Sequence, residues 1–365
     1  MRIGKITLDG FYNYGNILQS YALQEVLLRY SDRVETLWHE SDNFLPRIWW
    51  KWSWKEFVKF LVDWKGFRRD FLNGHTGREM VRQSRIKMFC DRYIHIRYSV
   101  AELKDLDAEY DCFIVGSDQV WNYHFTNLKD SLLTFAEKGK RLSYAASICT
   151  PVVPPKIEKE LCEGFRGMRA ISVREEEGAE FVQRISGCHA EVHVDPTMLL
   201  TAEEWRAVAR KPQWCSEDDY LLTYFLGKRP DVIDQIAKEY SLSVVNLLDD
   251  SVFDHYVTDV AEFLWLIDHA KLFYTDSFHG TVFSILFRTP FVVCNRMGDS
   301  TSEKMSSRID TLLQRFDLKE RRGTKKNKFC ISDPLQILFS PRTNDILAEE
   351  RIRSNDFLRT FLQAG

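Results

Sequence analysis

The sequence contains few of the patterns that mark zinc-binding, disulfide-stabilised or membrane-spanning proteins. Its eight cysteines are scattered, with no Cys-x-x-Cys pair and no Cys/His cluster. This distribution predicts reduced thiols and argues against a structural zinc site. None of the nine histidines has a second histidine four residues away on a predicted helix. No stretch approaches a transmembrane span free of charges.

An excess of charge of one sign is also lacking. The net charge is only -3, from 50 basic and 53 acidic residues, so nothing suggests a nucleic-acid partner. Internal repeats and low-complexity segments are absent. The first residues run directly into a predicted strand, so no signal peptide is expected and the predicted location is cytoplasmic.

What the chain does contain is enough apolar sequence for two domains, with 44% hydrophobic residues among 365. Strand and helix patterns alternate in both halves, which predicts an α/β fold of two facing, doubly wound domains with a cleft between them. We place an N-terminal domain at 1–200, with a helical insertion at about 46–92. A C-terminal domain follows at 201–344, and a last helix at 345–365.

The stretch 273–280 organises the second domain. A buried strand is predicted to end near Tyr274 and an apolar helix to begin near Thr281, so Asp276 to Gly280 lies where a strand gives way to a helix. That position is the carboxyl edge of a parallel sheet, where ligands bind, and a helix N-terminus favours an anion. Read alone, Asp-Ser-x-His is better explained by a capping Asp276 or Ser277 and a packed histidine; the remaining motifs reverse that preference.

A glycine-containing turn at 9–16 connects the first predicted strand, 2–8, to a helix at about 17–29. It lacks the G-x-G-x-x-G spacing of a dinucleotide site, and Asn16 is its predicted N-cap. A ligand-binding turn and a plain connection explain it equally well.

Polar residues follow three more predicted strands of the first domain. These are Gly116–Asn122, Ser147 and Arg174, each directly after its strand. Arg174 would reach an anion held at the sheet edge, and the alternative is a salt bridge to one of the glutamates at 175–177.

Residues 48–69 combine basic side chains with five tryptophans: Trp49, Trp50, Trp52, Trp54 and Trp64. This composition is typical of a helix at a membrane interface. A lid or dimer contact packed on protein is the commoner explanation of such a helix. The next predicted helix, 77–92, carries Arg78, Arg82 and Arg85 on what is most simply a solvated face.

Seven short motifs occur in a specific order across most of the chain, omitting the tryptophan-rich segment. They are Asn13–Leu23, Val115–Asn122, Tyr144–Ser147, Ile171–Glu175, Val194–Thr197, Thr275–Gly280 and Ser307–Ile309. Through them the chain resembles the polysaccharide pyruvyltransferase family. The resemblance implies a fold similar to the GT-B glycosyltransferases. It also implies phosphoenolpyruvate as donor and a saccharide as acceptor, which receives pyruvate as a cyclic ketal.

One departure concerns the donor contacts. Some relatives carry arginine two positions before the histidine, where this chain has Ser277, so another cation must hold the donor here. Arg174 and Arg308 are the candidates, because arginine binds phosphate and carboxylate bidentately. The remaining substrate-binding residues that we predict are Ser277, Phe278, Gly280, Asn13, Asn16, Gln119, Asn122 and Ser147.

Ketal formation needs an acid to protonate the donor and a base to activate the acceptor. His279 is the candidate acid, or alternatively a phosphate ligand; Asp118 is the first choice of base and Asp9 the second. No metal or cofactor is required, because protein cations can neutralise the donor.

Two other functions remain open from the sequence. One is a nucleotide-sugar glycosyltransferase of the same architecture, and the other is a non-catalytic saccharide-binding protein. Retention of His279, Arg174 and Asp118 together argues against the second. The sequence does not distinguish a free acceptor from a lipid-linked one; a lipid-linked acceptor would suit a peripheral protein at the inner membrane face.

Overall fold

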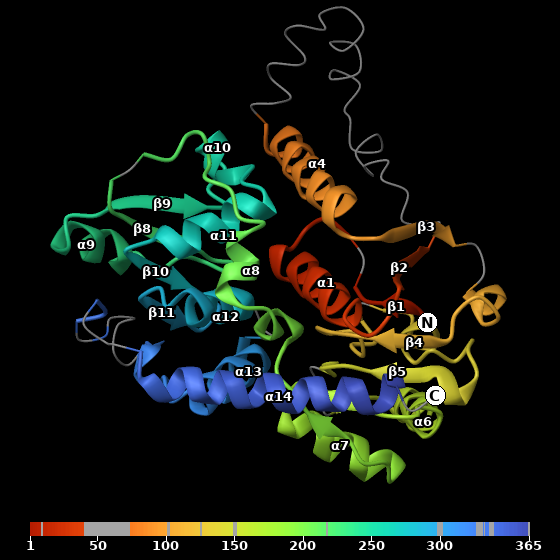
Figure 1. Ribbon diagram of the computed structural model, residues 1–365. Coiled ribbons are helices and arrows are strands. Elements are labelled where there is room, and N and C mark those ends of the chain that lie inside the picture. Colours follow the sequence, from red (N-terminus) through yellow and green to blue (C-terminus); the bar gives the residue numbers. More distant parts are fainter. Residues whose placement is uncertain are drawn as a thin grey trace, which may run out of the picture.

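Two parallel β-sheets form the frame of the protein (Figure 1). The computed structural model describes residues 1–8, 10–39, 74–100, 103–124, 126–148, 152–216, 218–297, 302–325, 331, 333–335 and 339–363. Asp9 and the tryptophan-rich residues 48–69 lie outside these ranges. Within them, the predicted fold class is confirmed.

The first sheet has the strand order β3-β2-β1-β4-β5, with every neighbouring pair parallel. The strands are β1 (Arg2–Ile6), β2 (Arg33–His39), β3 (Ile96–Val100), β4 (Cys112–Val115) and β5 (Arg141–Ser143). A small sheet of β6 (Ser172–Val173) and β7 (Glu191–Val192) continues beyond β5 through isolated bridges. All four residues of β4 are buried, as expected of a parallel strand covered on both faces.

The second sheet has the order β12-β11-β10-β8-β9 and is also parallel throughout. Its strands are β8 (Tyr220–Tyr224), β9 (Ser243–Leu247), β10 (Leu272–Thr275), β11 (Phe291–Cys294) and β12 (Arg322–Gly323). In both sheets the chain reverses its direction of winding once, between β1 and β4 and between β8 and β10. Such switch points are where open α/β sheets bind ligands.

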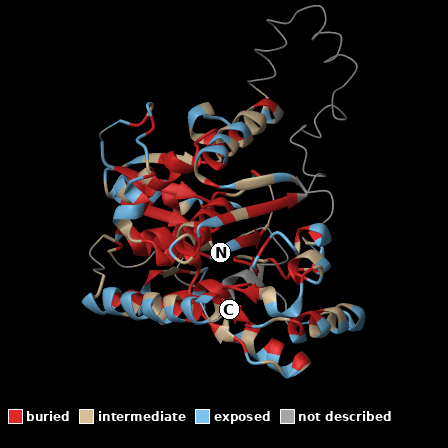
Figure 2. Cartoon of the chain, turned by 45° about the vertical axis from the view of Figure 1, so that its right-hand side comes forward, coloured by how far each residue is buried: buried red, intermediate tan, exposed pale blue. Residues whose placement is uncertain are grey.

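Helices cover the sheets (Figure 2). Many helices have one exposed side, whereas the strands are mostly buried. Those of the first half are α1 (Tyr14–Leu27), α4 (His75–Tyr93), α5 (Leu128–Ser131), α6 (Pro155–Arg166) and α7 (Glu176–Ser186). Those of the second half are α8 (Ala202–Arg206), α9 (Val232–Glu239), α10 (Phe253–Tyr256), α11 (Val260–His269), α12 (Phe278–Phe287), α13 (Ser302–Arg315) and α14 (Pro341–Gln363). No helix among the described residues is long and apolar enough to cross a membrane.

Helix α1 lies between the two halves and is buried on nearly all sides. The ring of Tyr14 stacks on Phe263 of α11 at 4.6 Å, and its hydroxyl donates to the carbonyl of Thr258 at 2.6 Å. Helix α14 runs along both halves (Figure 1), and its Arg351 donates to the carbonyls of Met198 and Leu200 in the connection between them. One continuous apolar core therefore joins the two sheets.

Two local predictions were wrong. Helix α1 begins at Tyr14, and its N-cap is Asn13, whose Oδ1 accepts from the Gly15 amide at 2.8 Å. Asn16 lies inside the first turn instead, where its side chain donates to the Leu8 carbonyl at 2.9 Å. The sequence offers two asparagines three residues apart, and the actual start of the helix decides which of them caps.

The arginines of α4 do not form a solvated face. Arg82 is only 4% exposed and donates to the Tyr12 carbonyl at 2.9 Å, with its guanidinium 4.9 Å from the Tyr14 ring centroid. Arg85 reaches the second half, where it donates to the Val257 carbonyl at 3.2 Å. The helix packs against both halves, so side chains that would face water on a lone helix become buried.

Candidate active site

The candidate site forms where the N-termini of α1 and α12 meet across the two halves. Gly15 of α1 faces His279, the second residue of α12, so closely that an added Cβ on Gly15 would lie 2.1 Å from His279 Nδ1. The hydroxyl of Ser277 caps α12 by accepting from the Gly280 amide at 3.2 Å. This places His279 at the predicted strand-to-helix boundary, facing the first half.

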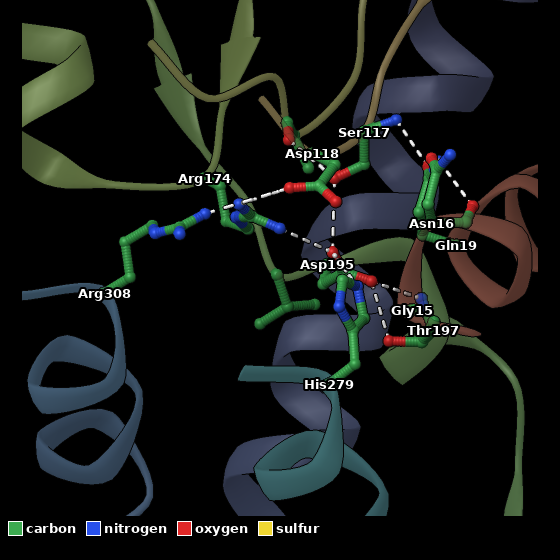
Figure 3. A network of polar contacts seen from close by, with 12 residues as sticks. Gly15, Asn16, Gln19, Ser117, Asp118, Arg174, Asp195, Thr197, His279 and Arg308 are labelled. Carbon is green, nitrogen blue, oxygen red and sulfur yellow. Dashed lines mark hydrogen bonds and ion pairs between the residues drawn. The ribbon is translucent and has the colours of Figure 1, made fainter. Parts of the chain in front are cut away.

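Asp195 is the carboxylate partner of His279 (Figure 3). It lies in the connection between the two halves, and its Oδ2 is 3.5 Å from His279 Nε2. Its Oδ1 accepts from the amide and the hydroxyl of Thr197 at 3.0 and 2.7 Å, and its Oδ2 accepts from the Ser117 hydroxyl at 3.2 Å. The side chain is fully buried, so these donors hold the carboxylate in one position.

Asp195 is held in its ionised form. Burial alone would raise its pKa, but the neighbouring His279 and Arg174 and the bonds from Thr197 outweigh it and hold the pKa well below its usual range. A fixed negative charge therefore faces the imidazole of His279. Such a carboxylate orients the ring.

Each of the three guanidinium nitrogens of Arg174 faces a carboxylate. Nη1 lies 3.0 Å from Asp195, Nε 3.2 Å from Glu175 and Nη2 3.4 Å from Asp118. Burial acts to lower its pKa, but the three carboxylates raise the pKa above its ordinary value. The guanidinium also stacks over the ring of Phe278 at 4.6 Å. Arg174 therefore holds the acidic groups of the site together.

Asp118 lies between two guanidinium groups. Its backbone is left-handed, with φ of 66°, and its Oδ1 accepts from the Gln119 amide at 2.9 Å. The same oxygen is 3.4 Å from Arg174 and 3.8 Å from Nη1 of Arg308, which comes from α13 of the second half. The structure thus brings together four predicted residues from distant segments: His279, Arg174, Asp118 and Arg308 (Figure 3).

A cavity that is partly open to solvent adjoins this network. Three arginines line it, namely Arg174, Arg308 and Arg315, beside the acidic Glu175 and Asp195. Its other lining residues are Val194, Met198, Phe278, Thr311 and Leu312. Arg315 pairs only loosely with acidic groups, at 3.5 Å from Glu176 and 3.7 Å from Glu350. The cavity therefore combines arginine side chains with an apolar wall, a lining of the kind that binds a small anion that carries carbon.

The remaining predicted residues shape the loops around this network. Gln119 Oε1 accepts from the side chain of Asn122 at 3.0 Å, and the amide of Ser147 donates to the Asp118 carbonyl at 2.9 Å. Gly280 packs closely against Phe273 and Thr275. Asn13 and Ser277 are helix caps, as described above. Asp9 lies outside the described residues. Asp276 is not a cap: its carboxylate accepts from the amides of the β8–α9 connection, at Leu226 and Gly227.

Several residues of the network could not be assigned from the sequence. Asp195 lies in an Asp-Pro-Thr turn that reads as a domain boundary, and its Asp-x-Thr spacing predicts only a local turn. Gly15, Ser117 and Thr197 lie within the family motifs but were not predicted as site residues, and Arg315 lies outside those motifs. Their roles come from contacts between segments that are distant along the chain.

Comparisons with known proteins point to one family. The family model described as polysaccharide pyruvyl transferase matches residues 13–296. That range contains His279, Asp195, Arg174 and Asp118. No curated protein matches the chain.

Solved structures with a similar fold are all remote in sequence. The UDP-GlcNAc 2-epimerase from Neisseria meningitidis, bound to UDP-GlcNAc, is 11% identical; 97% of this chain and 100% of that chain are covered, with a TM-score of 0.46. HepE from Anabaena in complex with UDP is 9% identical, with 100% of both chains covered and a TM-score of 0.45. MurG from Acinetobacter baumannii is 9% identical, with 97% of this chain and 94% of that chain covered and a TM-score of 0.38.

Proposed function

The chain belongs to the polysaccharide pyruvyl transferase family, and we propose that it transfers pyruvate from phosphoenolpyruvate onto two hydroxyls of a saccharide, forming a cyclic ketal. The product would enter a cell-surface or capsular polysaccharide. The observation that carries the proposal is the arginine-lined cavity beside the Asp195–His279 pair.

The chemistry of the cavity lining supports this donor. Phosphoenolpyruvate carries a phosphate, a carboxylate and a methylene carbon. Arg308 and Arg315 supply fixed positive charge for the two anionic groups, so this donor needs no further cofactor. Phe278 and Leu312 offer an apolar surface to the methylene. The N-terminus of α12 adds partial positive charge on the same side.

In the reaction, one proton is added to the methylene carbon of the donor, and each of the two sugar hydroxyls loses one. His279 donates a proton to the methylene carbon, which becomes a methyl group and leaves C2 cationic. A first sugar hydroxyl then bonds to C2 and loses its proton to Asp118. A second hydroxyl displaces phosphate from C2 and completes the ring, and its proton leaves with the phosphate. In this scheme Asp195 holds the imidazole of His279 in a single orientation.

The structure suggests different tasks for the two arginines that we predicted to bind the donor. Arg174 already faces three carboxylates, so we assign it chiefly to the placement of Asp118 and Asp195. Arg308 lines the cavity beside Phe278 and Leu312, so we assign it to the donor. A direct bond from Arg174 to the donor stays a prediction.

The test is phosphate release from phosphoenolpyruvate in the presence of a panel of saccharide acceptors, with nucleotide sugars assayed in parallel. His279→Ala should lower kcat by about 10²–10⁴-fold, the usual share of an acid catalyst, with the fold intact. His269→Ala, an exposed histidine of α11 stacked on Trp265, is the matched control and should be unaffected. Release of a nucleoside diphosphate from a nucleotide sugar, with none of phosphate, would contradict the proposal.

We also propose that the protein contacts the inner membrane face through residues 48–69, because their tryptophans and basic residues match a lipid headgroup layer. A lipid-linked acceptor would then be presented to the site. The chain should float with anionic liposomes at low salt. A variant with Trp49, Trp50, Trp52 and Trp54 changed to Ser should remain at the bottom. If the unchanged chain also remains there at every salt concentration, the segment packs on protein instead.

A further inference from the structure

An exposed tyrosine lies in the loop before α1, three residues from Gly15 of the candidate site. Tyr12 belongs to the connection from β1 to α1, and 63% of its surface is exposed. Single exposed aromatic residues are common on proteins, so exposure alone does not indicate a role. Two further observations set this one apart: how it is held and what lies next to it.

The backbone of Tyr12 is held by a buried cation. Its carbonyl accepts from Arg82, which is 4% exposed and reaches over from α4. The ring packs over Gly10, where φ is 102° and an added Cβ would lie 2.8 Å from the Tyr12 Cδ2. Asn13, the next residue, is fixed as the N-cap of α1. Burying a guanidinium is costly unless its bonds are made, so this loop is well anchored while its aromatic side chain points outward.

The loop of Tyr12 is connected directly to the candidate site along the chain. Gly15, three residues further on, touches His279, so the chain length alone limits the Tyr12–Gly15 Cα distance to about 10 Å. Strand β1 pairs with β4 up to Ile6 and Val115, so the loop of Tyr12 and the loop of Asp118 leave adjacent strand ends. The loop of Tyr12 therefore leaves the same sheet edge as the loop of Asp118, the base of the proposed reaction.

We propose that the exposed ring of Tyr12 is a stacking platform for a sugar ring of the saccharide acceptor, and that it contributes to acceptor affinity and not to chemistry. The inference rests on the proposed function for the identity of the acceptor. One face of a pyranose consists of C–H groups and buries well against an aromatic ring. Polar side chains at the same sheet edge, such as Asn13, Gln119 and Asn122, are of the kind that bind sugar hydroxyls.

The kinetic test separates affinity from chemistry. Tyr12→Ala should raise KM for an oligosaccharide acceptor about tenfold, the equivalent of one good stacking contact, while kcat and KM for phosphoenolpyruvate stay within about twofold. Tyr12→Phe should behave as the unchanged chain, because the ring face is retained. Tyr98→Ala is the matched control, since Tyr98 is also exposed (43%) but lies on β3 at the far edge of the sheet.

A second measurement keeps the inference independent of turnover. Saccharide binding without donor, followed by saturation-transfer NMR, should weaken in Tyr12→Ala and persist in Tyr12→Phe and Tyr98→Ala. If the chain releases no phosphate but shows this pattern of binding, the proposed function fails and the platform stands. If Tyr12→Ala retains normal acceptor KM and normal binding, the platform is refuted. A change confined to self-association would also refute it and would make this surface a protein contact.

Discussion

Gly15 lets the N-terminus of α1 approach His279 more closely than any residue with a side chain would allow. An added Cβ at this position would lie 2.1 Å from Nδ1, 2.4 Å from Cγ and 2.8 Å from Cβ of His279. Non-bonded heavy atoms of this kind normally stay about 3.5–4.0 Å apart. In Gly15→Ala, either His279 must turn away from Asp195 or α1 must move away from α12.

The expected magnitude follows from that overlap. Inside a helix, Gly→Ala ordinarily stabilises by about 0.5–1 kcal/mol. Overpacking of a buried contact costs about 1–3 kcal/mol, so we expect a net loss of about 1–2 kcal/mol in the free energy of unfolding. Displacing His279 from its 3.5 Å contact with Asp195 should also lower kcat by about 100-fold or more.

Urea unfolding and phosphate release at saturating donor and acceptor would measure both effects. Gly178→Ala is the matched control, because Gly178 also lies in the first turn of a helix, α7. An added Cβ there would meet Val173 Cβ at an ordinary 3.5 Å. This control should keep full activity and equal or slightly greater stability.

A double-mutant cycle ties the effect to His279. In the His279→Ala background the overlaps with Nδ1 and Cγ are gone and only the 2.8 Å contact with Cβ remains, so Gly15→Ala should destabilise the fold less, and a coupling of about 1–3 kcal/mol should appear. If Gly15→Ala alone retains the normal kcat and normal stability, the close approach of α1 to His279 is not a constraint and the site geometry argued here is refuted.

Three further perturbations test the surroundings of the site. Asp195→Asn should lower kcat about 100-fold. The lowered pKa of Asp195 stabilises the fold above the ordinary carboxyl pKa, and the unchanged chain loses this stabilisation below about pH 4. The variant should lack this stabilisation, so identical acid-unfolding profiles would contradict the prediction. Ser277→Ala should lower the free energy of unfolding by about 1 kcal/mol in thermal unfolding, because the α12 cap is lost. KM for the donor should stay nearly unchanged. A large rise in KM would indicate that Ser277 is a substrate ligand. Burial lowers the pKa of Lys5 to about 7 from 10.5. Unfolding therefore takes up a proton between pH 7 and 10.5. In this range the free energy of unfolding should rise by at most about 1.4 kcal/mol per pH unit. Lys5→Met should lack that rise in urea titrations from pH 6.5 to 10, and an unchanged slope would show that Lys5 does not titrate as a buried group.

The elements that the sequence predicted well are those that depend on neighbouring residues. The predicted strand-to-helix transition occurs, with β10 ending at Thr275 and α12 beginning at Phe278, and Thr201 and Glu204 form a capping box at the start of α8. Apolar periodicity and helix capping involve residues within one or two turns, so a single sequence carries the full signal. The alternation of such elements was enough to predict two doubly wound sheets and to place His279 and Asp118 at their carboxyl edges.

Local patterns were misleading where a second part of the chain packs on an element. Arg82 and Arg85 read as a solvated face because the helix carries no strong apolar stripe of its own there. In the fold, α4 lies against both halves, and the carbonyls of Tyr12 and Val257 satisfy these arginines. Burial of a charged side chain depends on donors and acceptors from elsewhere, which no periodicity encodes.

The sequence by itself therefore determined which segments would be strands and helices and which polar residues would lie at the strand ends. Only the tertiary structure decided the partners. It paired Asp195 with His279, directed Arg174 to three carboxylates, and set Gly15 directly against the imidazole. The physical reason is that secondary structure follows from local sterics and periodicity, whereas ion pairs and close backbone approaches depend on how separately formed elements pack. That packing involves residues far apart in the chain, and short motifs do not record it.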